Sequence, residues 1–87
     1  MEIKFTEVAT DHLNYFKNTN NQSILKKIKQ LLKNILETPY QGIGKPEALK
    51  YQYRGYWSRR INREHRLIYA IDKVNNWVVI YSLKGHY

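Results

Sequence analysis

Three kinds of side chain in this 87-residue sequence could together cleave RNA without a metal ion. Such cleavage needs a base that takes the proton from a 2′-hydroxyl, a cation beside the phosphate and an acid that protonates the departing 5′-oxygen. A carboxylate, a guanidinium and an imidazole can supply these roles. Glu47, the arginines that follow it and His86 are the candidates. Each proton-transfer group is typically worth about 10²–10⁴-fold in rate.

Each candidate also has an interpretation without chemistry, and spacing alone leaves both open. Glu47 follows Pro46, where an acid commonly starts a helix. His86 titrates near neutral pH by default, but a residue so close to the chain end can also be frayed and functionless. The tyrosines can stack on RNA bases or belong to the core and its rim. Those considered for stacking are Tyr53, Tyr56 and Tyr87.

A metal site, a cofactor and a membrane span are not expected. His12, His65 and His86 show no close ligand spacing, and the sequence has no cysteine. No glycine loop for phosphate binding and no serine nucleophile motif is found. No apolar run approaches the roughly 18 residues of a membrane span, and the start of the chain does not look like a secretory signal. These features fit a cytoplasmic protein.

The arginines lie on or beside a predicted β-hairpin. Residues 56–61 and 65–71 are rich in aromatic and β-branched residues, and residues 62–64 are short enough for the turn between them. Side chains alternate between the two faces of a strand, so Arg59 and Arg60 must point in opposite directions. Such a sheet would hold guanidinium groups rigidly for phosphate binding, although a solvated charged hairpin is an equal alternative. The arginines concerned are Arg59, Arg60, Arg63 and Arg66.

The formal net charge is +8, and it is distributed unevenly. Residues 1–44 contain six lysines and four acids, whereas residues 45–87 contain nine basic residues and three acids. The positive field therefore coincides with the predicted hairpin. An anionic partner follows naturally, whether RNA, DNA or an acidic protein segment, with charge kept only for solubility as the alternative.

The rest of the pattern predicts one α+β domain spanning residues 1–87. Residues 2–5 alternate as a short strand would, Thr6 is a plausible N-cap, and an apolar stripe starts at Ala9. A second helix has the clearest apolar periodicity, and two antiparallel helices on one side of a sheet are the simplest arrangement. Residues 38–46 form a turn-rich connection, and residues 77–83 are typical of a central strand. The apolar positions of the second helix are Ile24, Leu25, Ile28, Leu31, Leu32, Ile35 and Leu36.

Three motifs together closely resemble the YoeB/Txe family of bacterial toxins, within the RelE/ParE superfamily of toxin–antitoxin systems. They are Gly42-Ile-Gly-Lys-Pro-Glu-Ala-Leu-Lys50, the stretch from Gly55-Tyr-Trp-Ser-Arg-Arg to Tyr69, and the terminal His86-Tyr87. The likeness extends along the whole chain. It implies two N-terminal helices packed on one face of a small, twisted, mainly antiparallel sheet.

The resemblance also implies function and partners. It implies a toxin that enters the ribosomal A site and cuts the mRNA there, leaving a 2′,3′-cyclic phosphate and a free 5′-hydroxyl. It further implies a homodimer and a YefM-like antitoxin that neutralises the toxin, with operator DNA bound only through the toxin–antitoxin complex.

Site residues follow from the matched motifs. Glu47 matches the general base of the family, Arg66 its transition-state cation, His86 its general acid and Tyr87 a terminal aromatic needed for activity. Where family members often have an aromatic residue or arginine before this pair, the present chain has Lys84-Gly85, which could loosen the position of His86. The basic residues expected to bind substrate are Lys45, Lys50, Arg59 and Arg60.

Two other functions remain as alternatives. A ParE-like toxin on the same fold would inhibit gyrase and cut no RNA, although it would have no need of the pair formed by Glu47 and His86. A module that binds nucleic acid as a co-repressor, without catalysis, would not be toxic when expressed alone.

Overall fold

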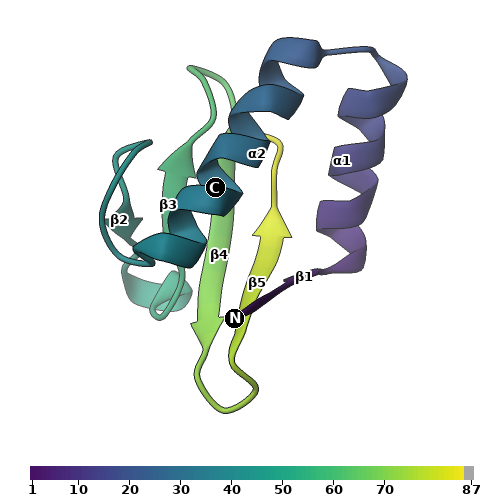
Figure 1. The fold of residues 1–87 in the computed structure, drawn as a ribbon. Coiled ribbons are helices and arrows are strands. Elements are labelled where there is room, and N and C mark those ends of the chain that lie inside the picture. The colour runs from purple at the N-terminus through teal and green to yellow at the C-terminus, as the bar shows by residue number, and fades with distance from the viewer. Residues whose placement is uncertain (86–87) are drawn as a thin grey trace.

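Two helices pack on a five-stranded sheet (Figure 1). The computed structural model describes residues 1–85. The α+β fold class expected from the sequence is confirmed. The elements in chain order are β1 (Glu2–Phe5), α1 (Glu7–Asn18), α2 (Gln22–Glu37), β2 (Glu47–Ala48), a short 3₁₀ helix (Tyr51–Tyr53), β3 (Trp57–Arg60), β4 (Arg66–Asp72) and β5 (Trp77–Ser82).

The sheet has the strand order β1-β5-β4-β3-β2. β1 pairs in parallel with β5, and the other three pairs are antiparallel, so the sheet is mainly antiparallel as expected. β5 lies between β1 and β4, which explains its continuous apolar sequence. β2 is an edge strand of only two residues. It pairs with β3, the first strand of the predicted hairpin.

Both helices begin at a polar residue that caps the first turn, and Thr6 is the one predicted from the sequence. The Thr6 hydroxyl accepts a hydrogen bond from the Ala9 amide at 3.1 Å, which caps α1. The Asn21 side chain accepts from the Ile24 amide at 3.4 Å and caps α2. One face of α2 is buried, as its apolar periodicity predicts, because residues three and four apart share a helix face. The buried residues of α2 are Ile24, Ile28, Leu31 and Ile35.

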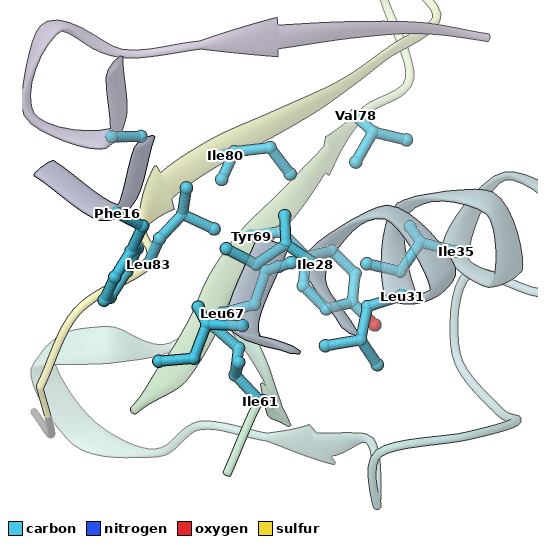
Figure 2. Packing of buried hydrophobic residues seen from close by; sticks show 12 residues of the cluster. Phe16, Ile28, Leu31, Ile35, Ile61, Leu67, Tyr69, Val78, Ile80 and Leu83 are labelled. Atoms are coloured by element: carbon cyan, nitrogen blue, oxygen red, sulfur yellow. The ribbon is translucent and has the colours of Figure 1, made fainter. Parts of the chain in front are cut away.

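The core lies between the helices and the sheet (Figure 2). Tyr69 of β4 and Ile80 of β5 are fully buried against Leu31 of α2 and Phe16 of α1. Tyr69 is therefore a core residue. Because this core fixes the helix-facing side of the sheet, the other side is left to carry the candidate site.

Candidate active site

Glu47 and Arg66 lie on the same face of the sheet. The Arg59 side chain bonds to α2, so its neighbours Ser58 and Arg60 point to the face opposite the helices. Glu47 is directly paired with Ser58, and Arg60 with Arg66, and directly paired residues share a face. The carboxylate and two guanidinium groups therefore project from one face, which we call the open face.

The distance between these groups suits a single nucleotide site. Glu47 and Arg66 are separated by two strand spacings and two residues along the strand. Strands lie about 4.8 Å apart and rise about 3.4 Å per residue, so their Cα atoms are about 12 Å apart. Both side chains are long, so they can approach one phosphodiester from opposite sides.

Three adjoining hollows connect these residues across the open face. Glu47 and Lys50 line the largest, of about 530 Å³. The next, of about 170 Å³, shares two residues with the first. The third hollow, of about 250 Å³, is lined by Arg66. The Arg66 amide donates a hydrogen bond of 3.1 Å to the carbonyl of Gly85, which lines the second hollow, so the two hollows adjoin. The second is lined by Leu49, Tyr53, Tyr56, Ile68, Tyr81, Ser82 and Gly85, and the third by Arg60, Asn62, Arg63 and Arg66.

Aromatic rings lie between the acid and the arginines. The rings of Tyr56 and Tyr81 are 4.8 Å apart and tilted by 35°. Burial raises the pKa of the Tyr81 hydroxyl, and the neighbouring Tyr56 adds to the shift, so the Tyr81 ring stays neutral at physiological pH. Aromatic rings beside a cationic hollow can stack on RNA bases.

The chain leaves the sheet beside Arg66. The Gly85 carbonyl accepts from the Arg66 amide at 3.1 Å, and the Gly85 amide donates to Nδ1 of His65 at 2.9 Å. Gly85 has a φ of +78°, a conformation that suits glycine. These bonds hold the attachment point of the last two residues next to the arginine hollow. His86 and Tyr87, the predicted general acid and terminal aromatic, lie outside the described residues.

Arg59 is not a substrate-binding residue, and the prediction for it is wrong. It is fully buried on the helix-facing side of β3. Its guanidinium donates five hydrogen bonds, so no donor is left to bind an anion. Arg59 and Arg60 point to opposite faces of β3, and the helices cover the face that carries Arg59. The acceptors are the Tyr69 hydroxyl, the Asn34 side chain and the carbonyls of Thr38, Gln41 and Ile43.

Arg59 instead anchors the loop that leads to Glu47. Three of its acceptors are carbonyls of residues 38–43, and the Tyr69 hydroxyl donates to a fourth loop carbonyl, that of Pro39, at 2.6 Å. Gly44 then passes so close that a Cβ there would lie 2.7 Å from Leu31. The loop is therefore fixed from the core side, and with it the position of β2.

The remaining predicted residues lie on the surface. Glu47 belongs to β2, so the alternative of a helix start is wrong. Lys50 is exposed and lines the same hollow as Glu47. Lys45 and Arg60 are exposed and share another hollow, of about 380 Å³, with Lys27. The open face and its rim thus carry all the predicted basic residues except Arg59.

Clusters of metal-ligating side chains and long apolar helices are absent from residues 1–85, the part of the chain that the structure describes. In this range, no three His, Cys, Asp or Glu residues gather closely enough to hold a metal ion. Neither α1 nor α2 is long and apolar enough to cross a bilayer.

Comparison with known proteins assigns the family. Residues 5–87 match the family model described as YoeB-like toxin of bacterial type II toxin–antitoxin system. The chain belongs to the YoeB toxin family. It is therefore a toxin of a type II toxin–antitoxin system.

Individual YoeB proteins match over the full chain. Toxin YoeB of Synechocystis sp. is 46% identical over 87 residues, which cover 100% of this chain and 98% of that protein. The YoeB dimer of Staphylococcus aureus superposes with a TM-score of 0.89 at 45% identity. YoeB in a heterotetrameric YoeB–YefM complex from the same organism gives a TM-score of 0.88 at 45% identity. Both structural alignments cover 100% of this chain and 98% of the Staphylococcus aureus YoeB chain.

Sequence reasoning missed Asn62 and His12 around this YoeB site. Asn62 lines the arginine hollow from the hairpin turn, together with Arg63, which the predicted hairpin had already indicated. The Asn62 side chain also accepts from the amides of Glu64 and His65, at 2.9 and 2.8 Å, and shapes that turn. An asparagine at the start of a three-residue turn was a usable signal. His12 was invisible as a site residue, because its partner Leu83 is 71 positions away.

The environment of His12 makes the stability of this YoeB protein depend on pH. Burial, reinforced by Lys84, lowers the pKa of His12 from its ordinary value of 6.5. As pH falls, the unfolded chain therefore takes up this proton before the folded protein does. We expect the contribution of His12 to the free energy of unfolding to be complete above about pH 6.5 and to be lost progressively below it.

Urea denaturation at pH 7.5 and pH 5.5 measures this contribution. We expect a smaller loss of stability between the two pH values in His12→Asn than in the unmodified protein, because the amide does not titrate. An equal loss in both proteins would contradict the assignment.

Proposed function

We propose that this toxin is a ribosome-dependent endonuclease that cuts mRNA in the ribosomal A site. The observation that carries the proposal is the open face, which Glu47 and Arg66 share, with the Arg66 amide hydrogen-bonded to the Gly85 carbonyl at 3.1 Å. A base, a phosphate cation and an acid within reach of one nucleotide are the requirements for cleavage through the 2′-hydroxyl.

Each group has one role in the proposed reaction. Glu47 takes the proton from the 2′-hydroxyl, and the oxygen attacks the adjacent phosphorus. Arg66, assisted by Arg60, stabilises the negative charge that grows on the phosphate. His86 donates a proton to the departing 5′-oxygen, and Tyr87 contributes as the terminal aromatic. The products are a 2′,3′-cyclic phosphate and a free 5′-hydroxyl, and every proton and bond is accounted for without a metal ion.

The surroundings of the acid and the arginines would hold the RNA. Lys50 lies beside Glu47, and Lys45 beside Arg60, so cations are available on both sides of the reacting phosphate. The tyrosine-lined hollow between them would receive a base. The ribosome would then present the mRNA in a fixed conformation, and such positioning supplies a large part of the rate.

The partners follow from the family and the charge. The Staphylococcus aureus relatives occur as a YoeB dimer and as a YoeB–YefM complex. We propose that the present toxin likewise forms a homodimer and is neutralised by a YefM-like antitoxin. A net charge of +8 suits an acidic antitoxin segment, and operator DNA would be bound only through the complex. Its target places its action in the cytoplasm.

Primer extension on cellular mRNA after induction of the toxin tests this function. We expect new 5′ ends within codons of translated messages, and we expect them to vanish when initiation is blocked, because the ribosome presents the substrate. Intact mRNA with DNA damage would instead support the gyrase alternative. Absence of toxicity without the antitoxin would support the co-repressor alternative.

A further inference from the structure

We propose that His12 and His65 are positioning residues that hold residues 83–85, here called the terminal segment, with two imidazole acceptors and thereby place the end of the chain for catalysis. This inference rests on the proposed function, because the end of the chain carries His86. Nothing in the sequence motifs points to either histidine in this role.

The geometry is the same at both histidines. The Leu83 amide donates to Nδ1 of His12 at 3.1 Å, and the Gly85 amide donates to Nδ1 of His65 at 2.9 Å. Nδ1 can accept these bonds only when it carries no proton, so both imidazoles must be neutral with their proton on Nε2. Two side chains from separate parts of the fold thus bond alternate amides of the terminal segment.

The two contacts have no substitute nearby. β5 ends at Ser82, so the Leu83 and Gly85 amides lie beyond the regular ladder. The Gly85 carbonyl accepts from the Arg66 amide, which fixes the terminal segment on the side of β4. The fully buried Leu83 side chain holds it from the core. The histidines therefore supply the amide partners that the end of the sheet lacks.

The surroundings of His12 favour its neutral form. It projects from α1 and faces Lys84 of the terminal segment and His65 of the hairpin, with Asp11 on its own helix. Burial lowers its pKa, Lys84 adds to this effect, and Asp11 opposes it. Lys84 itself lies 4.1 Å from the ring of Tyr15, so the cation is held near this site.

His65 is fixed by contacts on three sides. Its ring meets the Phe16 ring of α1 edge-on, with centroids 5.2 Å apart. Its amide donates to Asn62 at 2.8 Å, and its Nε2 lies 4.0 Å from the exposed carboxylate of Glu64. Arg66 is the next residue in the chain, so a shift of this ring would disturb the arginine and the terminal segment together.

Loss of either acceptor should displace the terminal segment. A misplacement of about 1 Å can cost on the order of 10²-fold in rate even when the altered residue does not touch the reacting atoms. Protonation of His12 would act in the same way, because a protonated Nδ1 cannot accept the amide. Burial and Lys84 lower the pKa of His12 from its ordinary value of 6.5, so we expect the rate of mRNA cleavage to be retained at that pH and to fall at more acidic pH.

The test compares two substitutions at each histidine. Phenylalanine keeps a ring but removes the acceptor, whereas asparagine places an oxygen near the position of Nδ1 and does not titrate. We expect His65→Phe to lower ribosome-dependent cleavage roughly 10- to 100-fold. We expect His65→Asn to retain most of the activity at pH 7.5 and the double variant His12→Asn/His65→Asn to lose the fall in rate at acidic pH.

Amide hydrogen exchange supplies a readout that does not depend on activity. We expect the Gly85 amide to exchange at least about tenfold faster in His65→Phe, and the Leu83 amide in His12→Phe, with each effect confined to its own partner. If a phenylalanine variant fails to fold, the exchange of both amides in the unmodified protein at pH 7.5 and pH 5.5 serves instead. The protection of the Leu83 amide, whose acceptor His12 takes up a proton at acidic pH, should fall at the lower pH.

The outcomes separate this inference from the proposed function. Unchanged exchange in the phenylalanine variants, or faster exchange with unchanged cleavage, would overturn the positioning role. The positioning role would also be overturned if the cleavage rate of His12→Asn/His65→Asn still fell at acidic pH. If the unmodified toxin cut no mRNA, the proposed function would fail, while exchange would still show whether the two imidazoles hold the terminal segment.

Discussion

Replacement of Glu47 by glutamine will lower ribosome-dependent mRNA cleavage by about 10²–10⁴-fold, the usual worth of one proton-transfer group. Glutamine keeps the shape of the side chain but cannot take the proton from the 2′-hydroxyl. Because Glu47 is exposed on an edge strand, we expect the free energy of unfolding to change by no more than about 0.5 kcal/mol. Single-turnover cleavage on programmed ribosomes, together with urea denaturation, measures both quantities.

A matched control lies at the other edge of the same sheet. Glu2→Gln makes the same chemical and charge change on β1, the edge strand farthest from β2, and should leave cleavage unchanged. His86→Gln should reduce cleavage to a similar degree as Glu47→Gln. The double variant should lose far less than the product of the two single effects, because groups that act as a unit are not additive. Full cleavage by either single variant would show that the acid–base assignment is wrong.

Replacement of Arg59 by leucine should lower the free energy of unfolding by about 3–5 kcal/mol, the cost of breaking a buried charged network. The substitution removes the guanidinium donor of the Thr38, Gln41 and Ile43 carbonyls and of the Asn34 side chain. A domain of this size is stable by only about 5–15 kcal/mol, so the loss is severe. Urea denaturation measures it, and a change below about 1 kcal/mol would contradict the anchoring role.

The neighbouring residue is the matched control. Arg60→Leu removes the same charge one position along β3, but from an exposed side chain on the open face. We expect its stability to change by no more than about 0.5 kcal/mol and its cleavage rate to fall about tenfold or more, since a phosphate cation is lost. Loss of stability in one variant and of activity in the other would distinguish the two faces of the strand.

Most of the secondary structure could be predicted from local sequence patterns. The apolar repeat of α2 and the alternation of residues 56–71 depend only on helix and strand geometry, so one sequence suffices to recognise them. The fold class followed from these elements. β2 was not recognisable, because a strand of two residues has no period to detect. Its pairing with β3 is nevertheless what brings Glu47 onto the open face.

The sequence by itself determined the helices, the hairpin, the concentration of positive charge and, through its motifs, the identity of the candidate catalytic residues. It also required Arg59 and Arg60 to point in opposite directions. Only the tertiary structure decided which of the two faces the core, because that depends on which side of the sheet the helices cover. The same holds for the contacts of His12 and His65 with residues 83–85, because Leu83 lies 71 positions from His12 and Gly85 lies 20 positions from His65. Periodicity is a local property, whereas these contacts depend on chain closure over many residues.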